Sequence, residues 1–172
     1  MSNVQFLALD VSLSCTGLAV MSMTDENKFV LHSKNSIVVP QKKNKTRFDR
    51  KYDIYLLFKY YLDQYKDVLK FAVFENYAFG AKGQLLDLAE VSALYKLALT
   101  EVAIPFDVLP PKSSKLIVAG HGGASKQDVA RALPNFLVNY ADFDFNSLDE
   151  TDAIANGIAY SLKMIQEIAK WI

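Results

Sequence analysis

The first forty residues contain three stretches in which apolar and polar positions alternate. Residues 4–9, 16–23 and 29–39 show this two-residue period, which is typical of β-strands. The first stretch ends at Asp10 and the third at Pro40. Because only short, turn-like segments separate the three, the pattern predicts an antiparallel meander.

The rest of the chain alternates between helical patterns and short apolar runs. Residues 48–66 carry apolar side chains at helical spacing, and residues 84–103 are apolar nearly all round, which predicts one amphipathic and one buried helix. The runs at residues 71–74 and 106–109 are typical of short buried strands. The second run is stopped by two prolines.

Two capping-box patterns predict where the last helices begin. Ser125 with Asp128, and Ser147 with Glu150, have the spacing of capping boxes. The final helix then has an apolar stripe at Ile154, Ile158, Ile165, Ile168 and Ile172.

The order β-β-β-α-β-α-β-α-α predicts an α/β fold in one domain, residues 1–172. We expect a five-stranded mixed sheet, with three antiparallel strands followed by two parallel strands and helices on both faces. This is the arrangement of ribonuclease H-like folds.

Composition narrows the class of protein. The chain has 172 residues, of which 51% are hydrophobic and 22% charged, and this excludes a disordered chain, a collagen and a disulfide scaffold. Cys15, the one cysteine, cannot pair within the chain, so we expect a cytoplasmic protein. The sequence has no apolar run of bilayer length and no signal-peptide pattern, which predicts no membrane association.

Charge is balanced overall but unevenly distributed. Lys and Arg number 19, as do Asp and Glu, so the net charge is zero. Bases concentrate at residues 42–51 and 112–131, and acids at residues 142–152. A basic run is either a solvated face or a strip that binds phosphate. The second interpretation predicts DNA contacts for Lys42, Lys43, Lys45, Arg47, Lys82 and Lys112.

Four acids occur where predicted strands end or a helix begins. Asp10 ends the first strand and Glu75 the fourth, and parallel pairing of these strands would bring the two carboxylates together. Asp149 and Asp152 are three residues apart, so they share one face of the last helix. Taken singly, Asp149 also suits a helix N-terminus and Asp10 also suits a turn.

Convergence of these four carboxylates would require cations. Four negative charges in a partly dry site repel one another strongly. Oxygen ligands without His or Cys favour Mg²⁺, with Mn²⁺ as an alternative ion. Two such ions about 4 Å apart are the usual arrangement for phosphodiester hydrolysis.

Four ordered motifs resemble the RuvC family of Holliday-junction resolvases over most of the chain. The first is Leu9-Asp10-Val11-Ser12-Leu13-Ser14-Cys15-Thr16-Gly17, and the second is Phe74-Glu75-Asn76-Tyr77. The third runs from Pro110 to Val129, with Lys115 and Lys126 at the family's eleven-residue separation. The fourth is Asp149-Glu150-Thr151-Asp152-Ala153-Ile154-Ala155.

This resemblance implies a homodimeric endonuclease that cuts four-way DNA junctions symmetrically. The metal-binding acids would be Asp10, Glu75, Asp149 and Asp152. Lys115 and Lys126 would lie near the scissile phosphate. An aromatic residue after Glu75 would pack against bases at the crossover, for which Phe79 is the first candidate and Tyr77 the second.

The expected reaction is metal-assisted hydrolysis that leaves 5′-phosphate and 3′-hydroxyl ends. Three alternatives remain open at this point. They are a ribonuclease H-like nuclease acting on other branched DNA, RNA–DNA hybrids or precursor RNA, an actin-like ATPase half-domain, and an inactive junction-binding module. The loop at residues 120–126 lacks the ending of a phosphate-binding loop, so we expect no nucleotide cofactor.

Overall fold

Five strands form one mixed sheet in a computed structural model that describes residues 4–76 and 85–170. The spatial order is β3-β2-β1-β4-β5. β1 pairs antiparallel with β2, and β2 with β3, whereas β4 runs parallel to both β1 and β5. The predicted sheet is therefore confirmed. The strands are β1 (Gln5–Asp10), β2 (Thr16–Met23), β3 (Phe29–Ile37), β4 (Leu69–Glu75) and β5 (Phe106–Leu109).

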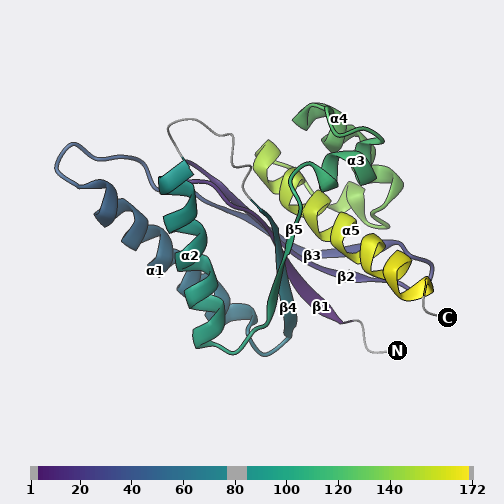
Figure 1. Cartoon of the computed structure of the whole chain (residues 1–172), viewed down its shortest axis with the longest axis horizontal. Coiled ribbons are helices and arrows are strands. Elements are labelled where there is room, and N and C mark those ends of the chain that lie inside the picture. The colour runs from purple at the N-terminus through teal and green to yellow at the C-terminus, as the bar shows by residue number, and fades with distance from the viewer. Residues whose placement is uncertain (1–3, 77–84, 171–172) are drawn as a thin grey trace.

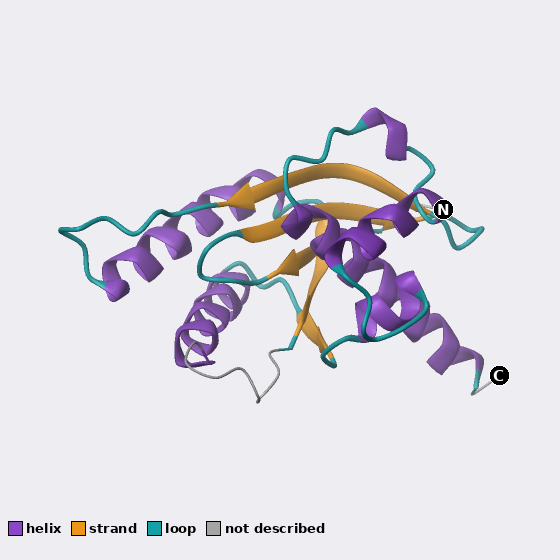
Figure 2. Cartoon of the chain, turned by 90° about the horizontal axis from the view of Figure 1, so that it is seen from above, coloured by secondary structure: helices purple, strands orange, loops and turns teal. Residues whose placement is uncertain are grey.

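Helices cover both faces of the sheet, as predicted (Figure 1). One face carries α1 (Arg47–Tyr65) and α2 (Leu85–Glu101). The other carries α5 (Leu148–Ala169), with α3 (Ser113–Ala119) and α4 (Lys126–Ala132) outside it. Viewed from above, the two helical layers lie on opposite sides of the curved strands (Figure 2).

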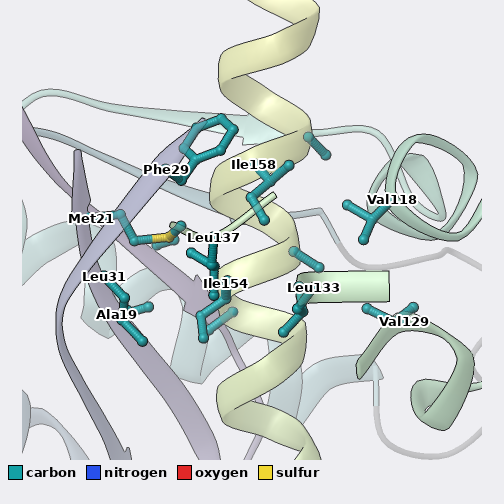
Figure 3. Close-up of a cluster of buried hydrophobic side chains, with 14 of the residues drawn as sticks. Ala19, Met21, Phe29, Leu31, Val118, Val129, Leu133, Leu137, Ile154 and Ile158 are labelled. Carbon is teal, nitrogen blue, oxygen red and sulfur yellow. The ribbon is translucent and has the colours of Figure 1, made fainter. Parts of the chain in front are cut away.

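The central strand β1 is buried on both sides because it lies between these layers. Phe6 and Ala8 belong to the core beneath α5, while Leu7 and Leu9 belong to the core beneath α1 and α2. Figure 3 shows Ile154 and Ile158 of α5 packed between side chains of β2 and β3 and those of α3 and α4, including Met21, Leu31, Val118 and Val129. The sheet and α5 are thus fixed to each other by a continuous apolar contact.

The structure differs from the predicted elements in three places. Helix α3 was not predicted, because seven residues between Pro111 and Gly120 are too short to show a helical period. Ile168, placed on the buried stripe of the last helix, is 55% exposed and lines an open hollow with Phe6 of β1 and Phe71 of β4. Leu57, which the helical pattern of residues 48–66 places on the apolar stripe, is also exposed.

Among the helices within residues 4–76 and 85–170, none combines the length and the apolar character that crossing a bilayer needs.

Candidate active site

Two of the predicted acids end neighbouring parallel strands. Leu9 of β1 pairs with Phe74 of β4, so the next residues, Asp10 and Glu75, leave the sheet side by side. Both line an open cavity of about 260 Å³, whose other walls come from the first turns of α2, the loop before α3 and α3 itself. Parallel pairing therefore juxtaposes the two carboxylates, as expected.

The first two turns of α5 bring two more acids to this place. Side-chain oxygens of Asp10, Asp149 and Asp152 all lie within 4.8 Å of one another. Glu75 is not part of this triad, but it lies close enough to Asp152 for their charges to interact. The four predicted acids are thus brought to one site, three as a tight cluster and the fourth beside it.

The start of α5 is held against the sheet by unusually close backbone contacts. Gly17, opposite Asp10 on β2, has no Cβ, and one added there would lie 1.9 Å from the carbonyl oxygen of Asp149. One turn beyond Asp152, the Asn156 side-chain amide donates a hydrogen bond of 2.9 Å to the Leu9 carbonyl. These contacts fix the helix relative to the end of β1.

Replacement of Gly17 by alanine is expected to destabilise the fold by about 3 kcal/mol or more, because the methyl group meets backbone atoms that cannot rotate away. Urea denaturation measures this loss of free energy of unfolding. Gly122→Ala is the matched control, since the nearest atom to its added Cβ is 3.8 Å away. Equal stability of the two variants would contradict the close approach.

A lysine provides the positive charge at the centre of the triad. The Nζ atom of Lys126, the first residue of α4, lies 3.3 Å from Asp10 Oδ2, 2.7 Å from Asp149 Oδ1 and 2.6 Å from Asp152 Oδ2. The expected position of Lys126 was near a scissile phosphate, and the structure places its ammonium group on the carboxylates. One cation thus faces three acids.

The ionisation of the acids is set first by burial and then by Lys126. Burial raises the pKa of Asp10 from 3.8 to about 6, against the opposing effect of Lys126. Burial also raises the pKa values of Glu75 and Asp152. For Asp149, burial is outweighed by hydrogen bonds from Lys126 and from the Cys15 thiol, so its pKa is lowered.

The raised pKa of Asp10 predicts how pH acts on the metal-free protein. Between pH 3.8 and about 6 the folded state binds more protons at Asp10 than the unfolded state, so this contribution to stability is lost as pH rises. At 1.36 kcal/mol per pKa unit, the cost above pH 6 is about 3 kcal/mol.

Urea denaturation of the wild type and of Asp10→Asn in chelator, from pH 4 to pH 8, isolates this effect. The variant should gain stability relative to the wild type as pH rises through this range. A difference that does not change with pH would contradict the prediction.

The donor set fits a hard divalent cation. Asp10, Asp149 and Asp152 offer oxygen ligands within reach of a single ion. Glu75 Oε1 is buried and has no hydrogen-bond partner among the described residues. A buried carboxylate oxygen without a donor is costly unless a cation satisfies it. The residues present therefore suit the metal that the sequence predicted.

The other predicted residues lie around the site or outside the described part of the chain. Lys112 and Lys115 line the cavity with Glu75. Lys42 and Lys43 are exposed in the loop before α1, whereas Lys45 and Arg47 pair with Asp53 and Asp87, respectively. Tyr77, Phe79 and Lys82 lie outside the described residues.

Sequence reasoning missed two contacts in and beside this site. Cys15 is partly buried, and its thiol faces Asp149. Lys34 forms an ion pair with Glu150, so only half of the predicted capping box is present. The Ser147 hydroxyl accepts a hydrogen bond from the Glu150 backbone N–H, but the Glu150 carboxylate contacts Lys34 of β3 instead of the backbone of Ser147. No pattern in the sequence joins residues 34 and 150. The box at Ser125 and Asp128 is complete, as predicted.

The chain is similar in sequence and in fold to known proteins. No family model matches the chain. It is 24% identical over 164 residues to a crossover junction endodeoxyribonuclease RuvC of Prochlorococcus marinus, covering 95% of this chain and 98% of that protein. A second strain's RuvC is 23% identical with the same coverage.

Among solved structures, Thermus thermophilus RuvC superposes with a TM-score of 0.77 at 17% identity, covering 95% of this chain and 96% of that one. The same protein in complex with a Holliday junction substrate gives 0.75 at 18% identity, with 92% and 93% covered. The yeast mitochondrial Holliday junction resolvase gives 0.62 at 14% identity, with 96% and 85% covered. Sequence and fold together confirm the predicted resemblance to the RuvC family.

Proposed function

We propose that this relative of the RuvC proteins is a metal-dependent endonuclease that resolves four-way DNA junctions by paired, symmetric nicks. The observation that carries the proposal is the meeting of Asp10, Asp149 and Asp152 beside Glu75, within a fold that RuvC shares. The Thermus thermophilus protein has been captured with a Holliday junction, and the Prochlorococcus relatives are named for junction cleavage.

The four acids are the proposed metal ligands. They would hold two Mg²⁺ ions, or Mn²⁺ in their place, through oxygen atoms alone. When bound, such ions lower the pKa of an attacking water and stabilise the leaving oxygen, which gives 5′-phosphate and 3′-hydroxyl ends. No other cofactor is needed for this chemistry.

The lysines of the site act on the phosphate. Lys115 lies on the cavity wall with Glu75, where its charge is available to a phosphate placed over the acids. Lys126 reaches the acids from the start of α4, so its charge is available to stabilise negative charge that develops in the reaction.

Further basic side chains would bind the arms of the junction. Lys42, Lys43, Lys45, Arg47 and Lys82, together with Lys112, would contact backbone phosphates with little sequence information. Phe79, or Tyr77 in its place, would contact the bases at the crossover.

A homodimer would match the two-fold symmetry of the junction and bring two sites to it. The outer side of α1 offers a face for such a contact, because large apolar residues at four-residue spacing are exposed there. These are Phe48, Tyr52, Leu56 and Tyr60. We place the protein in the cytoplasm, where its single cysteine stays reduced.

The test compares a labelled synthetic four-way junction, a linear duplex and an RNA–DNA hybrid, each with and without Mg²⁺. We expect paired nicks in the junction only, in the presence of metal, and products that a ligase seals. Preferential cleavage of the hybrid would instead assign the site to another nuclease of this fold. Binding without cleavage in any divalent ion would indicate an inactive junction-binding module.

A further inference from the structure

Glu150 is a buried carboxylate that lies between two site aspartates in the sequence and points away from both. It is 3% exposed, although glutamate is rarely buried unless it is paired. The four proposed ligands do not include it. Its burial therefore needs an explanation of its own.

The partners of Glu150 come from β3 and from the residue before the helix cap. Lys34 Nζ lies 3.0 Å from Oε2, which also accepts a hydrogen bond of 3.0 Å from the backbone N–H of Asn146. The Ser36 hydroxyl donates to Oε1 over 3.3 Å. Ser36 also lies 3.2 Å from the hydroxyl of Ser147, the N-cap of α5. The contacts with Lys34 and Ser36 join the start of α5 to β3, an edge strand of the sheet.

Successive helical residues are rotated by about 100°, so Glu150 faces β3 while Asp149 faces the end of β1. The Lys34 side chain is 13% exposed, and its ammonium lies 5.9 Å from the centre of the Phe145 ring. The ion pair is thus shielded from water on two sides. With Glu150 bound to β3 and Gly17 against Asp149, the first turn of α5 has contacts on two different sides.

We propose that the Lys34–Glu150 ion pair is a positioning device, which sets the rotation of the first turn of α5 and so holds Asp149 and Asp152 at ligand distance from Asp10. The proposal rests on the proposed function, because it takes these aspartates as metal ligands. Lys34 and Glu150 touch neither metal nor substrate in this role. Polar groups behind metal ligands commonly change metal affinity by about 10–100-fold when they are removed.

The test is direct binding of Mn²⁺ in the absence of DNA, by calorimetry or by the spectroscopic signal of the free ion. Glu150→Gln keeps the size of the side chain and removes its charge, and should raise the Mn²⁺ dissociation constant by about 10–100-fold. Ser36→Ala removes one hydrogen bond to the carboxylate and should give a smaller increase. Lys34→Arg keeps the ion pair and should bind Mn²⁺ nearly as the wild type does.

Asp87→Asn is the matched control. Asp87 pairs with Lys51 at 2.6 Å, their side chains are 14% and 7% exposed, and the pair joins α1 to α2 on the opposite face of the sheet. This variant should lose stability and bind Mn²⁺ normally. Normal binding by folded Glu150→Gln, or equally weakened binding by Asp87→Asn, would overturn the proposal.

Three further outcomes are also decisive. If Glu150→Gln does not fold, Ser36→Ala decides, and an unchanged dissociation constant in that variant overturns the positioning role. If the wild type binds no Mn²⁺, the metal site and its positioning fail together. If Mn²⁺ binds as expected but no DNA is cut, only the proposed function fails.

Discussion

Replacement of Asp10 by asparagine is expected to remove junction cleavage while leaving junction binding intact. Asp10 is the one acid of the triad that belongs to the sheet. It clusters with the two aspartates of α5, and it lines the same cavity as Glu75. An amide of the same size supplies no negative charge to a cation there. We expect the cleavage rate to fall by at least about 10²–10³-fold, as when one group of a preorganised charged site is removed.

The rate is measured on a labelled four-way junction at saturating Mg²⁺, and binding by gel shift in Ca²⁺ or chelator. Asp144→Asn is the control, because Asp144 is exposed and the charge change is identical. Asp149→Asn should behave as Asp10→Asn does. A cleavage rate in Asp10→Asn close to that of the wild type would refute the metal site.

The fold could be predicted because its signals are local. Each strand ends at a recognisable break, and the two parallel strands each follow a helix, so the order of elements leaves few arrangements. From that order alone, Asp10 and Glu75 were expected at one edge of the sheet, and the register of β1 with β4 places them there. Spacing within one helix similarly joined Asp149 to Asp152.

The features that could not be predicted from the sequence depend on contacts between residues that are distant in the chain. Nothing near Lys34 in the sequence indicates Glu150, and nothing near Lys126 indicates three acids from two other elements. Glu150 also shows why a local pattern misleads. Its spacing from Ser147 favours a capping box, but the partly buried Lys34 offers the carboxylate a stronger, charge-assisted partner. Contacts with residues distant in the sequence therefore decide which partner such a carboxylate takes.

The position of Lys126 leads to a prediction in which metal affinity and cleavage change in opposite directions. Its ammonium group contacts all three carboxylates that are proposed to bind metal. A divalent ion that binds there must displace this ammonium or share the acids with it. Burial disfavours the charge on Lys126, yet the acids outweigh this effect and its pKa is raised, so the lysine stays charged as the competitor.

Lys126→Met should therefore bind Mn²⁺ more tightly than the wild type, since no internal cation competes for the acids. Its metal-free form should be less stable, because three carboxylates then face one another without a counter-charge. At saturating metal it should still cleave more slowly, by about 10²-fold, because the charge that stabilises the reacting phosphate is lost.

Tighter binding with slower cleavage separates this role from simple damage to the site, which would weaken both. Arg131→Met is the control: it removes a cation from the same helix, but its side chain is 77% exposed and pairs with Asp128. Calorimetric titration with Mn²⁺, thermal unfolding in chelator and single-turnover cleavage give the three readouts. If Lys126→Met bound Mn²⁺ more weakly than the wild type, Lys126 would be a partner of the bound metal, and the competition inferred from its three ion pairs would be wrong.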